Sequence, residues 1–582
     1  MRMLYLCLLF LLLSASFSFA KEGHLTLLAV KESDNGYEGT TADLYLELKP
    51  GTGRVFLDTF PLTKVDTQIS TRFARDIACS YLDADCGKYD FVYTIRADSP
   101  IVAGPSAGGA ITLLTISLLK GQTISDTISV TGTINSGGII GPVGGIKEKL
   151  DAAAQAGLKK VLIPEGERLI EESFNGTNIT TVDLVEYGKS KKLEVIEVSD
   201  INAAWSSFTG HKLEKDNYSL TIDQDYNLTM SYLAGQLCSR SKELMGEIDS
   251  RYSKNDSMLA AVNLTRKAET ALGNGRYYSA ASYCFGANVK LNYLLLSSRD
   301  FTKDEMRESS EVVLRNIKKL DESITRKEKK TVTDLEAFSV VKERLIEAED
   351  FYKEINSTDV YNLAYSFERV YSAYSWASFF DNRGAKYDFN TELLRSSCQR
   401  KIEEAEERFN YVKIFHPVLG LEGTRKEIDY AYSDLRNQSY ELCLFKATNA
   451  KAESDIILSV SGIGVDKLDN LLSRKISAAE KNIGKQIAKG NFPVLAFSYY
   501  EYAKELATYD PYSALLYAEY AIELSNLDMY FKKGKSFSFN LEMKPFVFLL
   551  IGLAFGYASA IVMRKRSINP SRAKNALLGK KR

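Results

Sequence analysis

The pattern of apolar residues changes near Tyr218, and this change limits the fold of the whole chain. Residues 24–210 alternate short β-branched runs with helical stretches, as in domains that combine strands and helices. From Tyr218 to about Lys533 the strand-like runs stop, and long patterns of Glu, Lys, Ala, Leu and Tyr at helical spacing take over. A chain of 582 residues is also too long for one core. We therefore expect an α/β (α+β) domain at 24–210 and an all-α domain at 218–535.

Within the first domain, strands and helices are expected to alternate along the chain. The predicted strands are 25–30, 42–48, 54–57, 90–96, 128–134 and 160–163, and the predicted helices are 67–84, 107–119 and 147–156, while 201–207 is left without an assigned type. Gly121 and Gly157 follow two of these helices directly, which is a common way to end a helix. The segment 182–196 completes the unit.

A weak internal repeat runs through the second domain. Four similar segments, each of which opens a helical stretch, contain Tyr278, Tyr361, Tyr440 and Tyr512. Small Ala and Ser residues beside large Tyr residues suit close packing of helices, as in solenoids of helical hairpins. A plain helical bundle fits the same pattern, and the sequence leaves this alternative open.

Both ends of the chain carry apolar segments. Residues 1–20 have the basic start, apolar centre and small-residue end of a secretory signal peptide, although an uncleaved N-terminal anchor is an alternative. Residues 545–563 contain no charge and are long enough to cross a membrane as a helix. The basic tail 564–582 follows at once, and positive charge marks the cytoplasmic side. We expect a single-pass cell-membrane protein whose bulk lies outside the cytoplasm.

Cysteines and charge agree with this location. After the predicted signal peptide an even number of cysteines remains, which suggests disulfides in an exported chain. We favour the pairs of sequence neighbours, Cys79–Cys86, Cys238–Cys284 and Cys398–Cys443. Several Asn-x-Ser/Thr motifs fit a glycoprotein, although such motifs also arise by chance. The bulk of the chain is acidic once the basic tail is set aside, which argues against nucleic-acid binding.

The segment around Ser106 suggests a nucleophile at the start of a helix. Ser106 lies in Gly-Pro-Ser-Ala-Gly, and the amides of Ala107 and Gly108 are candidates to stabilise an oxyanion. The chain has only three histidines, none within a recognisable motif, so a Ser-His-Asp triad and a zinc site are both disfavoured. A desolvated lysine can act as the base instead. Lys147 follows a glycine-rich turn at a helix start, whereas Lys149 is expected to face elsewhere.

These motifs together resemble one known family. The order Gly-Pro-Ser-Ala-Gly (104–108), Thr131-Gly132, Gly-Gly-Ile-Lys-Glu-Lys-Leu (144–150) and Ala-Gly-Leu-Lys-Lys-Val-Leu-Ile-Pro (156–164) resembles the proteolytic domain of Lon protease. The resemblance covers about 24–200 and implies a Ser/Lys dyad. It implies Ser106 as nucleophile, Lys147 as general base and Thr131 as a hydroxyl that helps to hold the lysine. It also implies a ring-shaped homo-oligomer, which the sequence itself does not test.

The sequence departs from the family pattern in ways that bear on function. The residues just before the Gly-Pro-Ser lack the usual acid, and 133–138 replace the usual run after Thr-Gly. No Gly-x-x-x-x-Gly-Lys-Ser/Thr phosphate loop occurs in the sequence, so no ATPase module of that type accompanies the proteolytic segment. The arrangement suggests a secreted, membrane-anchored protein of archaeal type that needs neither ATP nor another cofactor.

Two functions remain in competition at this stage. The first is an ATP-independent, membrane-anchored serine endopeptidase that cuts unfolded or flexible polypeptides outside the cytoplasmic membrane. The second is an inactive surface scaffold of the same fold, whose helical repeats bind protein partners. Self-processing is a third reading, although no cleavage site is marked. The presence of both dyad residues, Ser106 and Lys147, favours the enzyme.

Overall fold

The computed structural model describes most of the region between the two terminal segments. The described residues are 21–33, 36–62, 65–97, 104–174, 178–213, 220, 222, 224–299, 302–355, 360–380, 384–415, 420–460, 468–531 and 556. The chain forms two compact units, 1–533 and 534–582. Across the described ranges, no helix is both long and apolar enough to span a membrane. The predicted signal peptide (1–20), span (545–563) and tail (564–582) lie outside the described residues, apart from Gly556.

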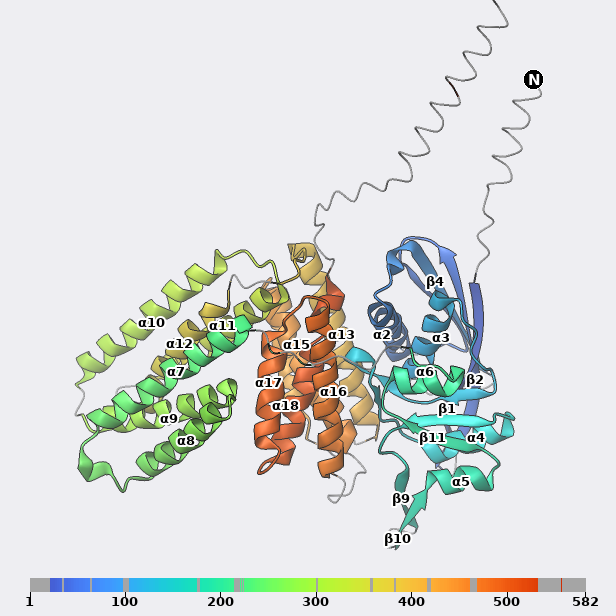
Figure 1. Ribbon diagram of the computed structural model, residues 1–582, viewed down its shortest axis with the longest axis horizontal. Helices are drawn as coiled ribbons and strands as arrows, with labels where there is room; N and C mark the ends of the chain where they lie inside the picture. Colours follow the sequence, from blue (N-terminus) through green and yellow to red (C-terminus); the bar gives the residue numbers. More distant parts are fainter. Residues whose placement is uncertain are drawn as a thin grey trace, which may run out of the picture. The chain divides into compact units, whose positions relative to one another are not determined.

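A four-stranded sheet forms the first part of the N-terminal region (Figure 1). Its strand order is β1 (Lys21–Ser33), β2 (Gly36–Pro50), β4 (Tyr89–Ala97) and β3 (Val55–Phe60). The pairs β1/β2 and β2/β4 are antiparallel, whereas β3 runs parallel to β4. Apolar residues alternate along these strands, and the inward-facing ones share a core with helices α2 (Val65–Leu82) and α3 (Gly108–Lys120).

A smaller parallel sheet follows, with the strand order β11 (Glu194–Val198), β8 (Lys160–Pro164) and β5 (Ile128–Val130). Strands β9 (Leu169–Phe174) and β10 (Asn178–Asp183) form a separate hairpin, and β6 (Thr133–Ile134) pairs with β7 (Ile140–Gly141). Helices α4 (Ile146–Gln155), α5 (Leu184–Ser190) and α6 (Ile201–Thr209) complete this part.

One prediction for this region needs correction. The predicted strand 128–134 is interrupted after Val130, because the backbone of Gly132 bonds to the serine segment instead of a neighbouring strand. The segment 182–196, for which the sequence indicated no element type, contains the end of β10, helix α5 and the start of β11. The remaining predicted strands and helices are present with ends that differ by a few residues.

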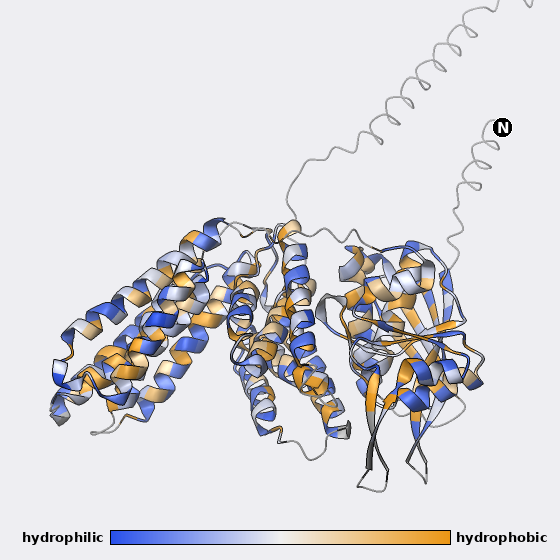
Figure 2. Ribbon diagram, turned by 60° about the horizontal axis from the view of Figure 1, so that its bottom comes forward, coloured by the Kyte–Doolittle hydropathy of each residue, from blue (hydrophilic) through white to orange (hydrophobic). Residues whose placement is uncertain are grey.

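The helical region consists of three-helix units. They are α7 (Gln224–Glu247), α8 (Asp256–Gly273) and α9 (Tyr277–Ser297); α10 (Lys303–Thr325), α11 (Val332–Lys353) and α12 (Val360–Trp376); α13 (Thr391–Phe415), α14 (Glu422–Arg436) and α15 (Tyr440–Val460); and α16 (Leu468–Ala488), α17 (Val494–Leu506) and α18 (Pro511–Leu524). In every unit the third helix packs against both others. Apolar and polar residues alternate along the helices (Figure 2), as expected where each helix buries one face.

The internal repeat corresponds to these units. Tyr278, Tyr361, Tyr440 and Tyr512 all lie in the first turn of the third helix of a unit. Helix α9 packs against α17, so the fourth unit contacts the first, and α11 packs against α15, so the second contacts the third. The repeat is therefore real, but its units close into a cluster instead of extending as an open solenoid.

The three disulfides have the predicted pairing. Cys79–Cys86 joins the end of α2 to the turn that precedes β4. Cys238–Cys284 joins α7 to α9, and Cys398–Cys443 joins α13 to α15. The two long-range disulfides thus occupy equivalent places in the first and third units.

Candidate active site

Ser106 lies in a 3-10 turn, Pro105–Ala107, that leads directly into α3. The Gly132 amide donates a hydrogen bond to the Ser106 carbonyl at 2.9 Å, and the Gly109 amide donates to the Gly132 carbonyl at 3.0 Å. A Cβ atom on Gly108 would lie 2.9 Å from Cγ2 of Ile134, so a side chain at this position would have to displace that neighbour. The serine turn is therefore fixed against the segment that begins at Thr131.

Lys149 is the buried lysine of the site. It lies on α4, and its side chain is almost wholly enclosed, with the residue 2% exposed. Its Nζ donates a hydrogen bond to Oγ1 of Thr131 at 3.1 Å. Helix α4 starts directly after Gly145, whose φ of 67° is in the left-handed region that favours glycine. This turn sets the direction of the helix and hence of the lysine.

The surroundings of Lys149 favour its neutral form. Burial lowers the pKa of Lys149 to about 7, although the carboxylates of Glu148 and Glu167 oppose this shift. Burial in turn raises the pKa of Glu167 to about 7, helped by Glu197 and opposed by Lys149. A lysine with a pKa near 7 is neutral in about half of the molecules at pH 7 and can then accept a proton.

Lys147 faces a different part of the molecule. Its Nζ lies 5.5 Å from the centroid of the Tyr187 ring, which belongs to α5. The residue is partly exposed, in contrast to Lys149. The prediction that Thr131 holds Lys147 while Lys149 faces elsewhere is therefore wrong. Ile146, Lys149 and Leu150 lie on the buried face of α4, and Lys147 does not.

Thr131 and Gly132 connect the serine turn with the lysine. The Thr131 hydroxyl contacts Lys149, and the next residue, Gly132, binds the backbone of Ser106. The Thr131 amide itself donates to the Leu162 carbonyl at 3.0 Å, which ties the pair of residues to strand β8. Ser106, Thr131 and Lys149 are thus attached to one short segment.

The two oxyanion candidates differ in their hydrogen bonding. The Gly108 amide donates to the Pro105 carbonyl within the 3-10 turn, so it is engaged in this conformation. The Ala107 amide is therefore the better candidate to stabilise an oxyanion next to Ser106.

Helix α13 of the helical region covers the serine turn. A Cβ atom on Gly104 would lie 3.2 Å from Cε2 of Tyr411, so the Tyr411 ring packs directly on this glycine. The Tyr411 hydroxyl accepts a hydrogen bond from the Gly144 amide at 3.4 Å, in the turn that precedes Lys149. Tyr411 thus contacts both the serine segment and the lysine segment. It was missed by the sequence analysis because no motif marks it.

Further contacts hold α13 and α18 to the segment after Thr131. The side chain of Glu523 accepts hydrogen bonds from the Ser136 hydroxyl at 2.9 Å and the Ser136 amide at 3.3 Å. Nη2 of Arg408 donates to the Ile134 carbonyl at 3.1 Å and to Oδ1 of Asn135 at 3.3 Å. The helical region therefore forms one wall of the site.

A cluster of buried carboxylates next to this wall has the ligand chemistry of a metal site. Its members, whose oxygens lie within 4.8 Å of one another, are Asp455, Glu519 and Glu523. Lys401 and Lys451 contact Glu523 at 2.7 and 2.8 Å, and Lys475 contacts Glu519 at 2.6 Å. Arg408 pairs with Asp455 at 2.9 Å, so a cationic side chain binds each of the three carboxylates and the cluster is an ion-pair network.

The region that carries Ser106 and Lys149 is similar in sequence to known proteins. Residues 97–178 match the family model of the Lon protease (S16) C-terminal proteolytic domain. A Lon protease of Phenylobacterium zucineum is 36% identical over 141 residues, which are 23% of this chain and 18% of that protein. An archaeal Lon protease of Archaeoglobus fulgidus is 39% identical over 101 residues, 17% of this chain and 14% of that protein. The chain thus spans less than a fifth of the length of these relatives.

Proposed function

We propose that this chain, whose residues 97–178 are of the Lon proteolytic type, is a serine peptidase with Ser106 as nucleophile and Lys149 as general base. The observation that carries the proposal is the buried Lys149 amino group on the Thr131 hydroxyl, beside the segment that holds Ser106. A serine hydroxyl needs such a base to attack a peptide bond at neutral pH.

The residues suggest a two-step reaction through an acyl-enzyme. Neutral Lys149 takes the proton of the Ser106 hydroxyl as its oxygen attacks the substrate carbonyl, and the Ala107 amide stabilises the oxyanion. The resulting ammonium group gives this proton to the leaving amine. Lys149 then activates water in the same way, and hydrolysis of the ester frees Ser106. Thr131 holds the lysine in position throughout.

The substrates that fit are unfolded or flexible polypeptides. The sequence contains no phosphate loop that would mark an ATP-driven unfolding module of its own. Helix α13 also covers the serine turn through Tyr411, which favours thin, extended substrates over folded ones. We therefore include independence from ATP in the proposal.

The proposed place of action is outside the cytoplasmic membrane, with residues 545–563 as anchor. The three disulfides support an oxidising compartment. The uncharged stretch 545–563 and the basic residues after it support the anchor and its direction.

The test compares Ser106→Ala, Lys149→Met and Lys147→Met in the full-length protein, with a casein-derived unfolded substrate. We expect the first two variants to lose at least about a thousandfold in kcat/KM and the third to keep its activity, with no effect of added ATP. A loss of kcat/KM only in Lys147→Met would assign the role of general base to Lys147. Equal hydrolysis by all four proteins would favour the inactive scaffold.

A further inference from the structure

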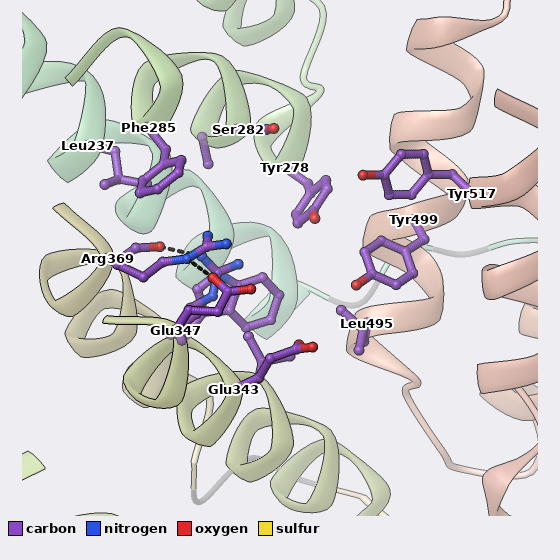
Figure 3. Close-up of a pocket in the computed structure, with 15 residues that line it drawn as sticks. Leu237, Tyr278, Ser282, Phe285, Glu343, Glu347, Arg369, Leu495, Tyr499 and Tyr517 are labelled. Carbon is purple, nitrogen blue, oxygen red and sulfur yellow. Dashed lines mark hydrogen bonds and ion pairs between the residues drawn. The ribbon is translucent and has the colours of Figure 1, made fainter. Parts of the chain in front are cut away.

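A cavity of about 330 Å³ lies within the helical region, away from Ser106 (Figure 3). It is lined by residues of α7, α9, α11, α12, α17 and α18, which belong to the first, second and fourth three-helix units. Its volume is at the lower end of the range for pockets that bind small molecules. Nothing in the proposed peptidase reaction uses this cavity.

One side of the cavity carries two arginines, of which only one has a carboxylate partner. Arg369 forms an ion pair with Glu347. Nη1 of Arg344 donates to the Ser372 hydroxyl at 2.5 Å, while its buried Nε has no hydrogen-bond partner in the part of the chain that the structure describes. Among the described residues, no carboxylate forms an ion pair with Arg344. Since a guanidinium group has five N–H donors, Arg344 keeps donors for a ligand.

The charge balance of the cavity favours an anion. Burial lowers the pKa of Arg344, and the nearby positive charge of Arg369 adds to this effect. Burial raises the pKa of Glu343 to about 7, so this carboxyl group is partly protonated at neutral pH. Glu347 acts on both arginines but forms its ion pair with Arg369, so an anion placed against Arg344 would meet a positive charge that is only partly compensated.

The opposite side of the cavity is aromatic. Tyr278, Tyr499 and Tyr517 lie across from the charged residues, on α9, α17 and α18 (Figure 3). The rings of Tyr278 and Tyr499 lie 6.0 Å apart between centroids, and those of Tyr499 and Tyr517 lie 5.3 Å apart. Aromatic walls of this kind bind apolar or aromatic groups. They also suit organic cations, but the two arginines disfavour a cationic ligand.

We propose that this cavity binds a small organic carboxylate with an aromatic or branched apolar body. The carboxylate lies on the Arg344 guanidinium group, and the body packs against the tyrosines across the cavity. Arginine binds carboxylates through two parallel N–H donors, which gives both affinity and orientation. Such a ligand is either a free acid or the C-terminal residue of a short peptide.

The cavity offers its own spectroscopic reporter. Trp376 lines it, and the Arg344 guanidinium carbon lies 5.3 Å from the Trp376 ring centroid. The chain has only two tryptophans, and the second, Trp205, is buried in the N-terminal region. A full-length Trp205→Phe protein therefore reports on this cavity through Trp376 fluorescence.

The experiment titrates this protein with N-acetylphenylalanine and with its uncharged amide. We expect a saturable change of Trp376 fluorescence with the acid and at least tenfold weaker binding of the amide. A second pair, a tripeptide that ends in Phe with a free or an amidated C-terminus, distinguishes a peptide terminus from a free acid as the source. Tight binding of only the free-terminus peptide identifies the peptide source.

Variants locate the binding site. Arg344→Met should weaken binding of N-acetylphenylalanine at least tenfold. Arg315→Met, at an exposed site on α10, should leave that binding unchanged. If Arg344→Met fails to fold, Arg344→Lys replaces it and should also weaken binding, because lysine lacks the paired donors. The proposal is overturned if the wild-type cavity binds acid and amide equally, binds tetramethylammonium in place of the acid, or binds none of these probes.

Discussion

Lys149 Nζ lies 3.1 Å from Thr131 Oγ1, and this contact joins the lysine to the segment that also holds Ser106. The lysine enters from helix α4 and the serine from the start of α3, so neither helix alone positions the pair. The arrangement depends on two adjacent residues, Thr131 for its hydroxyl and Gly132 for its backbone. Small changes at this segment should therefore affect catalysis more than stability.

The substitution Thr131→Val tests this relationship. It keeps the shape of the side chain but removes the hydroxyl that accepts the hydrogen bond from Lys149, so the lysine should lose its fixed orientation. A buried hydrogen bond of this kind is worth about 1–3 kcal/mol once one partner is left unsatisfied. We expect kcat to fall about ten- to hundredfold in a peptide-hydrolysis assay, with little change in KM.

Thr133 provides a matched control for this loss. It is also a buried threonine, and its hydroxyl has no hydrogen-bond partner. Thr133→Val should leave kcat close to that of the wild type. An equal loss of kcat in both variants would mean that Thr131 acts only through packing.

The pH dependence of the reaction should report the protonation of Lys149. The base is active when neutral, and burial lowers its pKa to about 7. Activity should therefore fall about tenfold per unit as the pH drops below 7, and it should level off above 7. The measurement is kcat/KM for a peptide without ionisable groups between pH 5 and 9. A rise that begins only near pH 10 would contradict the assignment.

The substitution Glu167→Gln should move this pH profile. The Glu167 carboxylate raises the pKa of Lys149, so its removal should lower that pKa and shift the acid limb to lower pH. Glu186→Gln, at an exposed site on α5, is the control and should leave the profile in place. A shift to higher pH would mean that Glu167 does not act on the lysine through its charge.

The local parts of the site could be predicted from the sequence. Ser106 and the helix that follows it are defined by residues close together in the sequence. Most strands and helices, and the disulfide pairs, were predicted correctly for the same reason. The choice between the lysines failed because it rested on distance from the glycine turn. The helical pattern of Ile146, Leu150 and Ala153, all buried, would have placed Lys149 on the inner face of α4.

Contacts between distant segments could not be predicted. Tyr411 lies far along the chain from Gly104, and only the packing of α13 brings them together. The interruption of the predicted strand at Thr131 has the same cause, because Gly132 bonds to Ser106 and Gly109 instead of continuing a ladder. The size of the repeating unit was also missed. The four repeat tyrosines each begin the third helix of a three-helix unit, and they do not mark two-helix hairpins.

The contact between Gly104 and Tyr411 can be tested with a double-mutant cycle. Gly104 has extended backbone, so valine is tolerated there apart from its clash with the Tyr411 ring. Gly104→Val should lower both stability and activity, and Tyr411→Ala should restore part of the loss. We expect a coupling of about 0.5–3 kcal/mol in urea unfolding of the full-length protein. Strictly additive effects would show that α13 does not cover the serine turn in solution.

Glu523 links the ion-pair network to the segment beside the active site. It is 1% exposed, and it binds Lys401, Lys451 and Ser136. Burial alone would raise the pKa of Glu523, but the two lysines hold it well below its usual range. The contribution of Glu523 to the free energy of unfolding is therefore present above about pH 4.5, the ordinary pKa of glutamate. It is lost as the pH falls through the lower pKa that Glu523 has in the folded protein.

The substitution Glu523→Gln should remove the nearer carboxylate partner of two buried lysines, Lys401 and Lys451, which would then share only Glu404 among the described residues. Removal of one partner from a buried pair costs about 3–5 kcal/mol, so urea unfolding at pH 7 should show a loss of that size. Because Ser136 donates to both oxygens of Glu523 and glutamine keeps only one acceptor oxygen, activity should also fall. Glu349→Gln, in an exposed pair with Lys353 on α11, is the matched control and should not change the unfolding midpoint. Equal free energies of unfolding for Glu523→Gln and the wild type would contradict this prediction. They would show that the lysines release their protons when the carboxylate is absent. The network would then not hold the helical region to the serine turn.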